Sequence, residues 1–495
     1  MVAPMNEAAK AARPQRSWFT ARSIAKAAGG AVVQGGATGQ GVATDSRADC
    51  AGKVFVALRG DRHDSHDYLA QAVKNGCVGL VVDRDVDVAS LLREAKLQRT
   101  REPFVVKVED TRRALLDLAR EHRRRSRARV IGITGSCGKT STKEWLGAVL
   151  ESVMPAVRSP GSYNNQVGVP LTLFQLREET RAAVVEIGTN APGEIAQLTE
   201  VARPDIGIVT CVAPAHLEGL GSLDGVAREK SCLPQGLPRD GVCILNGDDA
   251  ACREMAALTK ARVEFISVSR EAEWYATDVR FHALGTTFLL QGERPVTLPR
   301  LGRHNVYNAL AVIAAAHHLG VPEDEVLRQL ARVPSAARRL EPKLAGGVTI
   351  FDDTYNMNPE SARSALQAMA GLQTAGSGRG FAVFGGMAEL GHDSVALHRL
   401  LGEQVVQSGH DRLVCVGADA QPIAAGALGA GMAKDTVTCV EDLQAAYSLL
   451  RRELREGDRV LCKASRRVQL DRLVDRLVAE LGTSAGESGA EVQRG

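Results

Sequence analysis

The chain has 495 residues, which is too long for one hydrophobic core and predicts about three domains. Hydrophobic residues make up 44% and charged residues 24%, the proportions of an ordinary soluble globular protein. The net charge of +3 is spread along the chain, which argues against nucleic acid as the main partner. The densest basic run, Arg120 to Arg129, lacks aromatic residues, so we interpret it as a solvated helix end leading into an interdomain linker.

The ten cysteines are scattered without a C-x-x-C pair, which predicts reduced thiols in a cytoplasmic protein. A disulfide framework or a zinc site is not expected. No apolar run reaches transmembrane length, and the N-terminus lacks the apolar core of a signal peptide. We expect Met1–Arg16 to be a disordered extension and Thr483–Gly495 to be a disordered tail.

Residues 17–128 alternate short apolar strands with helical patterns, as an N-terminal α/β domain would. We predict strands at Val54–Leu58 and Val78–Val82, with a helix at Tyr68–Lys74 between them. His63 and His66 are half of a metal-binding pair, but no third ligand is evident, so we interpret them as loop residues.

A glycine-flanked loop between a strand and a helix is the most informative motif of residues 129–334. The apolar run Val130–Thr134 predicts a buried strand, and the loop Gly135-Ser136-Cys137-Gly138 follows it. Lys139-Thr140-Ser141 then opens a helix with apolar residues at helical spacing. Backbone N–H groups and a helix N-terminus hold phosphates, lysine reaches the terminal phosphates, and a threonine hydroxyl can ligate Mg²⁺. The motif therefore predicts a site for a nucleoside triphosphate.

The loop departs from the general pattern G-x-x-x-x-G-K-[ST], which requires glycine where this chain has Ile133. The alternative interpretation is an ordinary glycine-rich turn before a helix. The strand before the loop and the helix after it favour the phosphate site.

Further apolar runs at Ala182–Ile187, Ile206–Val212 and Val242–Leu245 predict a mostly parallel sheet with helices on both faces. Ligands bind outside the carboxyl ends of such strands. Glu186 ends one strand and His216 follows another, so both can reach a Mg²⁺ beside ATP. Taken singly, a solvated glutamate and a packed or capping histidine are the simpler interpretations.

Two other positions are ambiguous from the residues alone. Lys230 has the pattern of an exposed helix lysine. Asn305 and Asn308 lie three residues apart at the start of an apolar helix, where their amides suit a base edge or a helix cap. Capping is an equally good account of Asn305.

Residues 335–482 repeat the alternation, with strands predicted at Val348–Phe351, Phe381–Phe384, Leu413–Val416 and Val460–Cys462. Polar residues crowd the end of the first of these strands, from Asp352 to Asn358. Asn358 stands before a proline and is a good N-cap for the helix that follows. Capping does not explain the other polar residues of this group. The predicted fold is α/β with three domains: a central P-loop-type ATPase domain with a mostly parallel sheet, an N-terminal α/β substrate domain and a C-terminal doubly wound, Rossmann-like domain.

These motifs, in this order, resemble the Mur ligase family of ATP-dependent amide-forming enzymes over about Ser17 to Leu481. Within the family they are similar to the ligases that add D-alanyl-D-alanine to UDP-N-acetylmuramoyl-tripeptide. The segments that carry this resemblance are Thr142-Lys-Glu144, Asn164-Asn-Gln-Val-Gly-Val-Pro-Leu-Thr-Leu173, Pro192-Gly-Glu-Ile195, Pro214-Ala-His-Leu-Glu-Gly219, Asp352-Asp-Thr-Tyr-Asn-Met-Asn-Pro359 and Met387-Ala-Glu-Leu-Gly391. Three residues depart from the usual pattern: Cys137 replaces Asn, Asp or Ser, Tyr163 replaces leucine and Ala464 replaces glycine.

The resemblance implies a role for each matching residue. ATP would be held by Gly135, Ser136, Cys137, Gly138, Lys139, Thr140, Ser141, Asn308, Arg339 and Asp353. Mg²⁺, expected as two ions, would be held by Thr140, Glu186, His216 and Lys230, and Lys139, Glu186, His216 and Lys230 would be catalytic. Lys230 matches a position that is carbamylated in relatives, which is a hypothesis here. Substrate would be held by Ser46, Arg47, Asn164, Asn165, Asn356 and Asn358.

The implied reaction proceeds through an acyl phosphate, and the implied product is the UDP-muramoyl-pentapeptide precursor of peptidoglycan. A cytoplasmic monomer without a membrane span is expected. The nearest alternative is another ligase of the family, of the folylpolyglutamate or D-glutamate-adding type. A nucleotide-binding regulatory module and a purely structural role are the alternatives from other classes.

Overall fold

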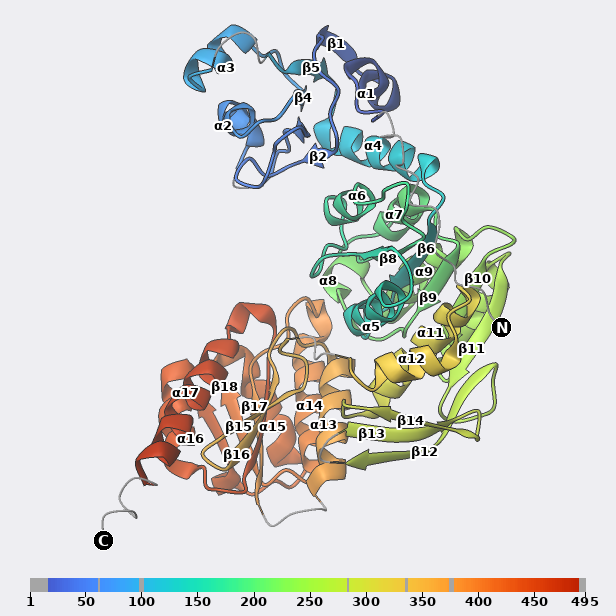
Figure 1. Ribbon diagram of the computed structural model, residues 1–495. Helices are drawn as coiled ribbons and strands as arrows, with labels where there is room; N and C mark the ends of the chain where they lie inside the picture. The colour runs from blue at the N-terminus through green and yellow to red at the C-terminus, as the bar shows by residue number, and fades with distance from the viewer. Residues whose placement is uncertain are drawn as a thin grey trace. The chain divides into compact units, whose positions relative to one another are not determined.

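The computed structural model describes residues 17–60, 63–97, 102–282, 285–333, 337–373 and 378–488 (Figure 1). Three sheets lie one in each of the three segments predicted from the sequence. The predicted extension Met1–Arg16 and the centre of the second predicted linker, at 334–336, lie outside the described residues. By contacts, residues up to 129 group with 162–183 and 200–203 in one compact unit, and the remaining residues form the second unit. The exact domain boundaries stay a prediction.

The N-terminal sheet has the strand order β1-β5-β4-β3-β2. Four of its strands run parallel, and β1 is antiparallel to β5. Its core is built around Phe55, Leu80 and Phe104, which are fully buried. The elements are α1 (Ala21–Ala28), β1 (Ala31–Gln34), β2 (Val42–Ala43), β3 (Val54–Val56), α2 (Leu69–Lys74), β4 (Gly79–Val82), α3 (Val88–Glu94), β5 (Phe104–Lys107) and α4 (Thr111–Arg125).

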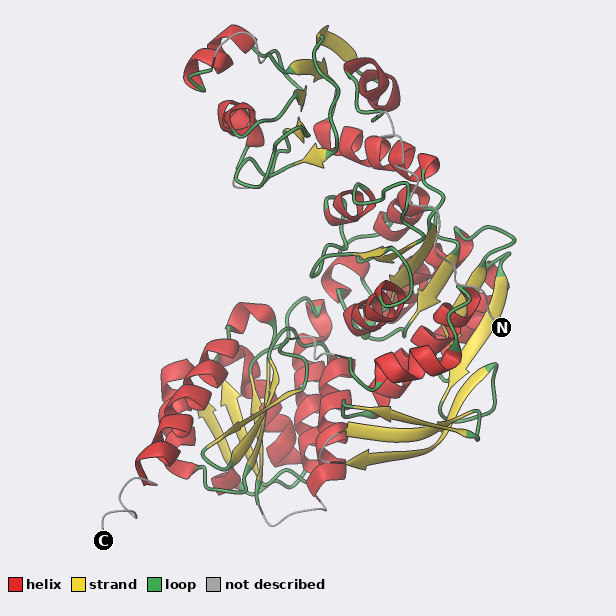
Figure 2. Ribbon diagram, viewed as in Figure 1, coloured by secondary structure: helices red, strands yellow, loops and turns green. Residues whose placement is uncertain are grey.

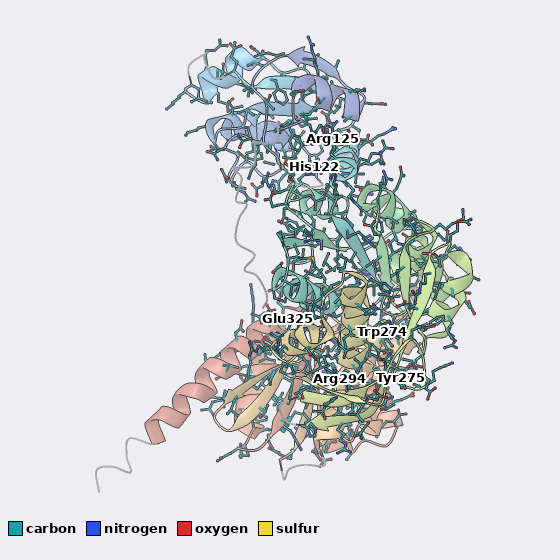
Figure 3. The ribbon with its side chains drawn as sticks, turned by 45° about the vertical axis from the view of Figure 1, so that its right-hand side comes forward. His122, Arg125, Trp274, Tyr275, Arg294 and Glu325 are labelled. Carbon is teal, nitrogen blue, oxygen red and sulfur yellow. The ribbon has the colours of Figure 1, made fainter. Side chains whose placement is uncertain are left out.

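The helix α4 ends within the basic run, whose arginines are mostly exposed as expected, with Arg123 as the exception. Arg123 is buried, and its guanidinium donates to the carbonyl oxygens of Ala202 and Arg203. On the same helix, His122 accepts a hydrogen bond of 3.0 Å from the indole of Trp18, and Arg125 lies over that indole (Figure 3). Arginine side chains can pack their apolar stems and planar guanidinium groups against other residues while they keep contact with water. A count of charges in the sequence does not reveal this packing.

The central sheet has the order β14-β13-β12-β11-β10-β9-β6-β8-β7. The strand β6 pairs in parallel with β9, and β9 with β10, as predicted for a phosphate-binding sheet. The strands are β6 (Arg129–Thr134), β7 (Ala156–Arg158), β8 (Ala182–Glu186), β9 (Ile206–Val209), β10 (Val242–Asn246), β11 (Arg262–Ser267), β12 (Trp274–His282), β13 (Gly285–Leu290) and β14 (Arg294–Leu298). The helices are α5 (Lys139–Glu151), α6 (Gly168–Leu173), α7 (Glu194–Ala202), α8 (Leu217–Leu220), α9 (Leu223–Gln235), α10 (Ala250–Met255), α11 (Arg303–His318) and α12 (Glu323–Leu330).

Two features of this sheet differ from the sequence prediction. β9 ends at Val209 and not at Val212, because the chain turns there to bond the phosphate loop. The antiparallel strands β12 to β14 were not predicted (Figure 2). They extend the sheet from β11. The Trp274 indole on β12 donates a hydrogen bond of 2.8 Å to Glu264 on β11, and the Tyr275 hydroxyl donates one of 3.1 Å to the carbonyl of Gln291, which follows β13 (Figure 3).

The C-terminal sheet has the order β15-β16-β20-β17-β18-β19, with only β15 antiparallel. Separate hydrophobic cores fill its two faces, one around Met369 and Leu401 and the other around Leu450 and Val474, which confirms the doubly wound prediction. The strands are β15 (Glu341–Ala345), β16 (Val348–Asp353), β17 (Gly380–Phe384), β18 (Arg412–Val416), β19 (Val437–Val440) and β20 (Arg459–Lys463). The helices are α13 (Pro359–Gln373), α14 (Ser394–Gln407), α15 (Gln421–Gly429), α16 (Leu443–Glu453) and α17 (Asp471–Ser488).

The last helix, α17, runs into the segment that was predicted to be a disordered tail. It continues past Thr483 to Ser488, because extending a formed helix costs far less than starting one. The rest of the predicted tail lies outside the described residues. None of the helices in the described part of the chain is both long and apolar enough to cross a membrane.

Candidate active site

The phosphate loop joins β6 to α5, and two of its glycines are required by its geometry. Gly135 has a φ of 141°, and a Cβ there would lie 1.9 Å from the Thr210 hydroxyl. Gly138 has a φ of 85°, and a Cβ there would lie 2.5 Å from the Asn308 amide oxygen. Both positions therefore combine a backbone conformation that favours glycine with a close approach that only glycine allows.

The start of α5 is arranged as an anion site. Its N-cap residue, Gly138, has no side chain to satisfy the N–H groups of the first turn. The Lys139 ammonium folds back over the loop and donates to the Gly135 carbonyl at 2.5 Å. The Thr140 hydroxyl accepts a hydrogen bond of 3.1 Å from the Arg339 guanidinium. Backbone donors, the helix N-terminus and a lysine thus converge where terminal phosphates would bind.

The end of β9 supports the loop from beside it. The Ser136 hydroxyl donates to the Ala213 carbonyl at 2.8 Å, and the Ser136 N–H donates to the Cys211 carbonyl at 2.9 Å. The Thr210 hydroxyl donates to the Cys137 carbonyl. The hydroxyl and N–H of Ser136 and the carbonyl of Cys137 therefore tie the loop to the end of β9.

Asn308, expected at the adenine, lies buried directly under the loop. Its amide oxygen accepts from the Thr142 hydroxyl at 3.2 Å, and its amide nitrogen donates to Asn305 at 3.2 Å. Asn305 in turn donates to the Leu301 carbonyl. Asn305 is not the helix cap, because α11 begins after Gly302. A contact between Asn308 and adenine stays a prediction.

Glu186 is buried at the end of β8, as the strand-end rule predicted. Its carboxylate lies 3.8 Å from the ammonium of Lys143, which is itself fully buried on α5. Lys143 also pairs with Glu144 at 2.7 Å and donates to the Gly161 carbonyl. A buried lysine between two carboxylates links the helix of the phosphate loop to Glu186.

His216 precedes α8 with a φ of 54°, a conformation uncommon for a residue with a side chain. Its Nδ1 lies 2.5 Å from the carboxylate of Glu389, which comes from the C-terminal sheet segment. This hydrogen bond outweighs partial burial and lowers the pKa of Glu389. A carboxylate on one ring nitrogen leaves the other nitrogen to face a ligand, the usual arrangement for a metal-binding histidine.

Lys230 is almost completely buried on α9, so the interpretation as an exposed helix lysine is wrong. Burial, together with the nearby charge of Lys139, lowers the pKa of Lys230 to about 7. Its neighbour Glu229 has a structural role, since its carboxylate accepts from the N–H groups of Gly193 and Ile195 at 2.7 Å each.

The C-terminal segment contributes two side chains to the phosphate loop. Arg339 reaches Thr140 and stacks over the Tyr355 ring at 4.4 Å. Asn358 caps α13, as predicted, by accepting from the Ser361 N–H at 2.8 Å. The same amide oxygen accepts from the Cys137 thiol at 3.2 Å. The loop is therefore approached from the central and the C-terminal sheets together.

Asp353 and Asn356 lie beside Lys463 and not on the loop itself. The Asp353 carboxylate pairs with the Lys463 ammonium at 2.7 Å and accepts from the Leu340 N–H at 3.2 Å. Lys463 also donates to the Asn356 carbonyl at 3.0 Å. Sequence reasoning assigned Lys463 no role, although its place at the end of β20 is the same strand-end signal that identified Glu186.

Four of the six residues expected at the substrate, Ser46, Arg47, Asn164 and Asn165, lie in the other compact unit and have local partners. Arg47 is exposed and makes a bidentate pair with Asp45, while the Ser46 carbonyl accepts from Asn75. Asn165 accepts from the N–H groups of the residues that begin α6, and the Asn164 N–H donates to Ser162. Their contacts with substrate stay predictions.

No three His, Cys, Asp or Glu side chains gather as around a metal ion within residues 17–60, 63–97, 102–282, 285–333, 337–373 and 378–488. The side chains expected at Mg²⁺ offer a hydroxyl, a carboxylate and an imidazole, of which the oxygens suit this hard cation. Lys230 fits only as a carbamate, because an ammonium is a donor of hydrogen bonds and no metal ligand.

Comparison with known proteins identifies the family. The model of the Mur ligase middle domain matches residues 133–316, and that of the Mur ligase, glutamate ligase domain matches residues 338–466. The chain belongs to the Mur ligase family. It is 36% identical to the UDP-N-acetylmuramoyl-tripeptide--D-alanyl-D-alanine ligase of Escherichia coli, a match that covers 89% of this chain and 94% of that protein. The enzyme of the same name from Mycobacterium tuberculosis is also 36% identical, with 88% and 91% covered.

Solved structures of Mur ligases agree with this result. A crystal structure of MurF from Acinetobacter baumannii aligns with a TM-score of 0.83 at 31% identity, covering 93% of this chain and 99% of that chain. MurF from Thermotoga maritima in complex with ADP aligns with a TM-score of 0.77 at 26% identity, covering 90% and 98%. A folylpolyglutamate synthase from Mycobacterium tuberculosis, at 17% identity and a TM-score of 0.58, shares the fold alone.

Proposed function

We propose that this Mur ligase joins D-alanyl-D-alanine to UDP-N-acetylmuramoyl-tripeptide with hydrolysis of ATP to ADP and phosphate. The observation that carries the proposal is the phosphate loop, whose Thr140 and Cys137 are contacted by Arg339 and Asn358 from the C-terminal sheet segment. The near full-length similarity to ligases of this name supports the choice of substrates. The product would be the UDP-muramoyl-pentapeptide used in peptidoglycan synthesis, made in the cytoplasm by a monomer.

The reaction needs ATP because a carboxylate is a poor electrophile. The terminal carboxylate of the tripeptide attacks the γ-phosphorus, and ADP leaves. The amine of D-alanyl-D-alanine then attacks the acyl carbon, the C–O bond to the phosphate breaks, and inorganic phosphate leaves as the nitrogen loses a proton. Lys139 would offset the charge that develops on the transferred phosphoryl group, and Arg339 would reach it beside Thr140. ADP in the Thermotoga maritima structure supports the choice of nucleotide.

Mg²⁺, as two ions, would be held by Thr140, Glu186, His216 and carbamylated Lys230. When bound, it supplies positive charge that stabilises the phosphoryl oxygens. The burial of Lys230 supports the carbamate, since it lies close enough to the half-buried Lys139 for the two charges to repel. Addition of CO₂ to the neutral Lys230 amine forms an N–C bond and releases a proton, which replaces a cation with an anion. A carbamate signal after incubation with ¹³C-bicarbonate, absent in Lys230→Arg, would test it.

The substrate assignments complete the proposal. Ser46 and Arg47 would hold the UDP end of the nucleotide sugar, and Asn164 and Asn165 would lie nearer the acceptor. Asn356 and Asn358 would approach the dipeptide, Asn308 would contact adenine, and Asp353 would act on ATP through its pair with Lys463.

The test is phosphate release from ATP and Mg²⁺ with UDP-muramoyl-tripeptide and D-alanyl-D-alanine, each omitted in turn. We expect release only when both are present, with a pentapeptide product by mass spectrometry. Lys139→Ala should reduce turnover by at least about a hundredfold, the scale of losing one transition-state charge contact. Lys434→Ala, at an exposed lysine of the short helix Lys434–Thr436 in the C-terminal segment, is the matched control.

Two results would count against the proposed function. Phosphate release that needs neither substrate would favour a regulatory nucleotide-binding module. Release that instead requires glutamate with a folate or a UDP-muramoyl-alanine acceptor would favour one of the other ligases of the family.

A further inference from the structure

The phosphate loop of this chain carries a thiol, Cys137, at a position where the family usually has Asn, Asp or Ser. A second cysteine, Cys211, follows β9 and lies beside it. The Cys211 sulfur is 3.8 Å from the Cys137 carbonyl oxygen. Both thiols are free and half-buried, so neither is sealed in the core.

The backbone holds the two cysteines side by side. β6 and β9 are parallel neighbours with Thr134 opposite Val209, and the Thr210 N–H continues the ladder to the Thr134 carbonyl at 3.0 Å. Ser136 is the residue before Cys137, and its N–H donates to the Cys211 carbonyl at 2.9 Å. Neighbouring strands lie about 4.8 Å apart, within the separation that a disulfide spans.

The sulfur of Cys137 is also in a setting that favours the thiolate. The adjacent Cys211 thiol lowers the pKa of Cys137, and the Lys139 charge adds to the effect. The same interaction raises the pKa of Cys211. Cys137 would therefore react first and Cys211 second.

We propose that Cys137 and Cys211 are a redox pair, and that a hydroperoxide oxidises them to a disulfide that closes the phosphate loop to nucleotide. The Cys137 thiolate attacks one oxygen of hydrogen peroxide, the O–O bond breaks, and a sulfenic acid forms. The other oxygen leaves as hydroxide and takes up the proton that the Cys137 thiol released, which gives water. The Cys211 sulfur then attacks the sulfenic sulfur, and the S–O bond breaks. Hydroxide leaves and takes the remaining thiol proton as a second water.

The disulfide would act on nucleotide binding through the loop backbone. The Cys137 carbonyl is tied to β9 by the Thr210 hydroxyl, and its side chain now points to Asn358 at 3.2 Å. A bond from its sulfur to Cys211 would break the Asn358 contact and draw the loop backbone towards the end of β9. The loop N–H groups then no longer face the phosphates together. This step rests on the proposed nucleotide site.

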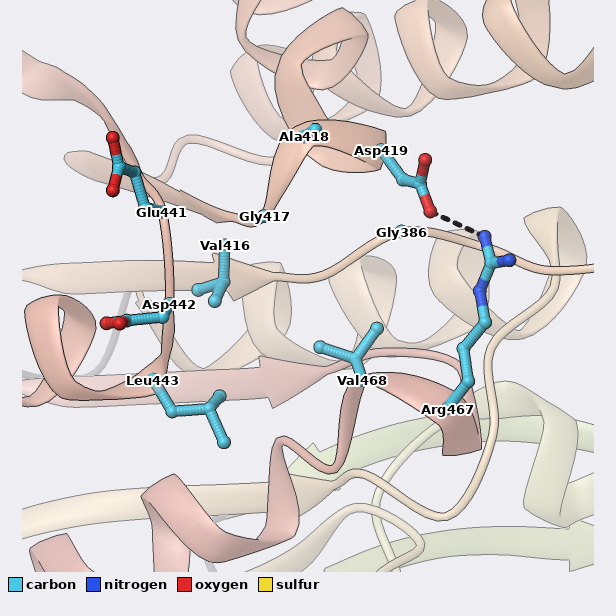
Figure 4. A pocket seen from close by; sticks show the side chains of 10 residues that line it. All are labelled: Gly386, Val416, Gly417, Ala418, Asp419, Glu441, Asp442, Leu443, Arg467 and Val468. Atoms are coloured by element: carbon cyan, nitrogen blue, oxygen red, sulfur yellow. Dashed lines mark hydrogen bonds and ion pairs between the residues drawn. The ribbon is translucent and has the colours of Figure 1, made fainter.

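The pocket at the end of β18 is a weaker candidate for a new site (Figure 4). Its cavity of about 450 Å³ is lined by Val416, Leu443 and Val468. Two of its three carboxylates are engaged, since Asp419 pairs with Arg467 at 2.7 Å and Asp442 caps α16. Nothing in it indicates one ligand.

The test treats the full-length protein with hydrogen peroxide, maps linked peptides by mass spectrometry and measures Mg²⁺-ADP affinity by calorimetry. We expect a linked Cys137–Cys211 peptide and a loss of ADP affinity of more than about tenfold, the effect of losing one hydrogen bond to a charged phosphate. Dithiothreitol should restore the affinity. ADP bound beforehand should slow the linkage, because its phosphates would cover the loop.

Variants separate this pair from other thiols. Cys211→Ser should form no linked peptide and lose the dithiothreitol-reversible change, whereas Cys439→Ser should behave like the parent. Cys439 is exposed and lies opposite Cys415 on the neighbouring strand, so it is a matched control for peroxide reactivity. Should Cys211→Ser fail to fold, the protection of the parent protein by ADP still tests the proposal.

Two outcomes would overturn the redox pair. One is the absence of a Cys137–Cys211 linkage at peroxide concentrations that oxidise Cys439. The other is a complete linkage that leaves ADP affinity unchanged. Failure of the reduced protein to bind ADP is a different result, because it would overturn the proposed nucleotide site itself.

Discussion

Replacing Gly138 by alanine, and comparing it with the same change at Gly193, separates two contributions to the free energy of unfolding: the backbone conformation and a steric contact of the new Cβ. Gly138 has a φ of 85° and Gly193, just before α7, has a φ of 88°. An alanine at either position adopts the left-handed region at a cost of about 1–2 kcal/mol. Only at Gly138 does the new Cβ meet a neighbour, the Asn308 amide oxygen at 2.5 Å, because nothing lies within 4 Å of a Cβ at Gly193.

The expected difference follows from that contact. Gly193→Ala should lower the free energy of unfolding by about 1–2 kcal/mol. Gly138→Ala should lower it by about 1–3 kcal/mol more, the usual cost of overpacking a buried site. Asn308 cannot move away freely, since it holds Thr142 and Asn305. Gly138→Ala should also weaken ADP binding, whereas Gly193→Ala should leave it unchanged.

Urea unfolding followed by tryptophan fluorescence measures the first effect, because Trp145 is buried on α5 beside the loop. Calorimetric titration with ADP measures the second. Equal destabilisation by the two substitutions, with equal ADP affinity, would refute the close approach of Asn308 as the reason for glycine at 138.

Two further predictions concern buried charges. Lys143→Met should lower the free energy of unfolding, measured by urea denaturation, by about 3–5 kcal/mol. The reason is that the substitution leaves the buried carboxylate of Glu186 without the cation beside it. A change below about 1 kcal/mol would contradict that role of Lys143. Burial acts to raise the pKa of Asp458, but its hydrogen bonds with Arg379 and with the Arg455 N–H together outweigh burial and lower the pKa. The stabilisation from Asp458 is therefore complete above the ordinary aspartate pKa and is lost as the pH falls through the lowered value. The urea midpoint of the parent should fall more steeply below about pH 4 than that of Asp458→Asn, and parallel curves would exclude the effect.

The sequence alone predicted the elements whose patterns are local. The apolar run before Gly135 predicted β6, and the cap at Asn358 predicted the start of α13, because both depend on neighbours within a few residues. Glu186 was found by the rule that ligands lie at the ends of parallel strands, which needs only the position of a strand. The family resemblance added Arg339, whose residue type and spacing alone allow a surface arginine.

Tertiary structure decided the rest, because the remaining contacts join residues that are distant in sequence. Arg339 meets Thr140 across 199 positions, and Asn308 meets Thr142 across 166. Lys230 has the local pattern of an exposed helix lysine, yet the sheet and the phosphate loop bury it and lower its pKa to about 7. A charged side chain changes its chemistry with its surroundings, and those surroundings exist only after the sheets have assembled around the loop.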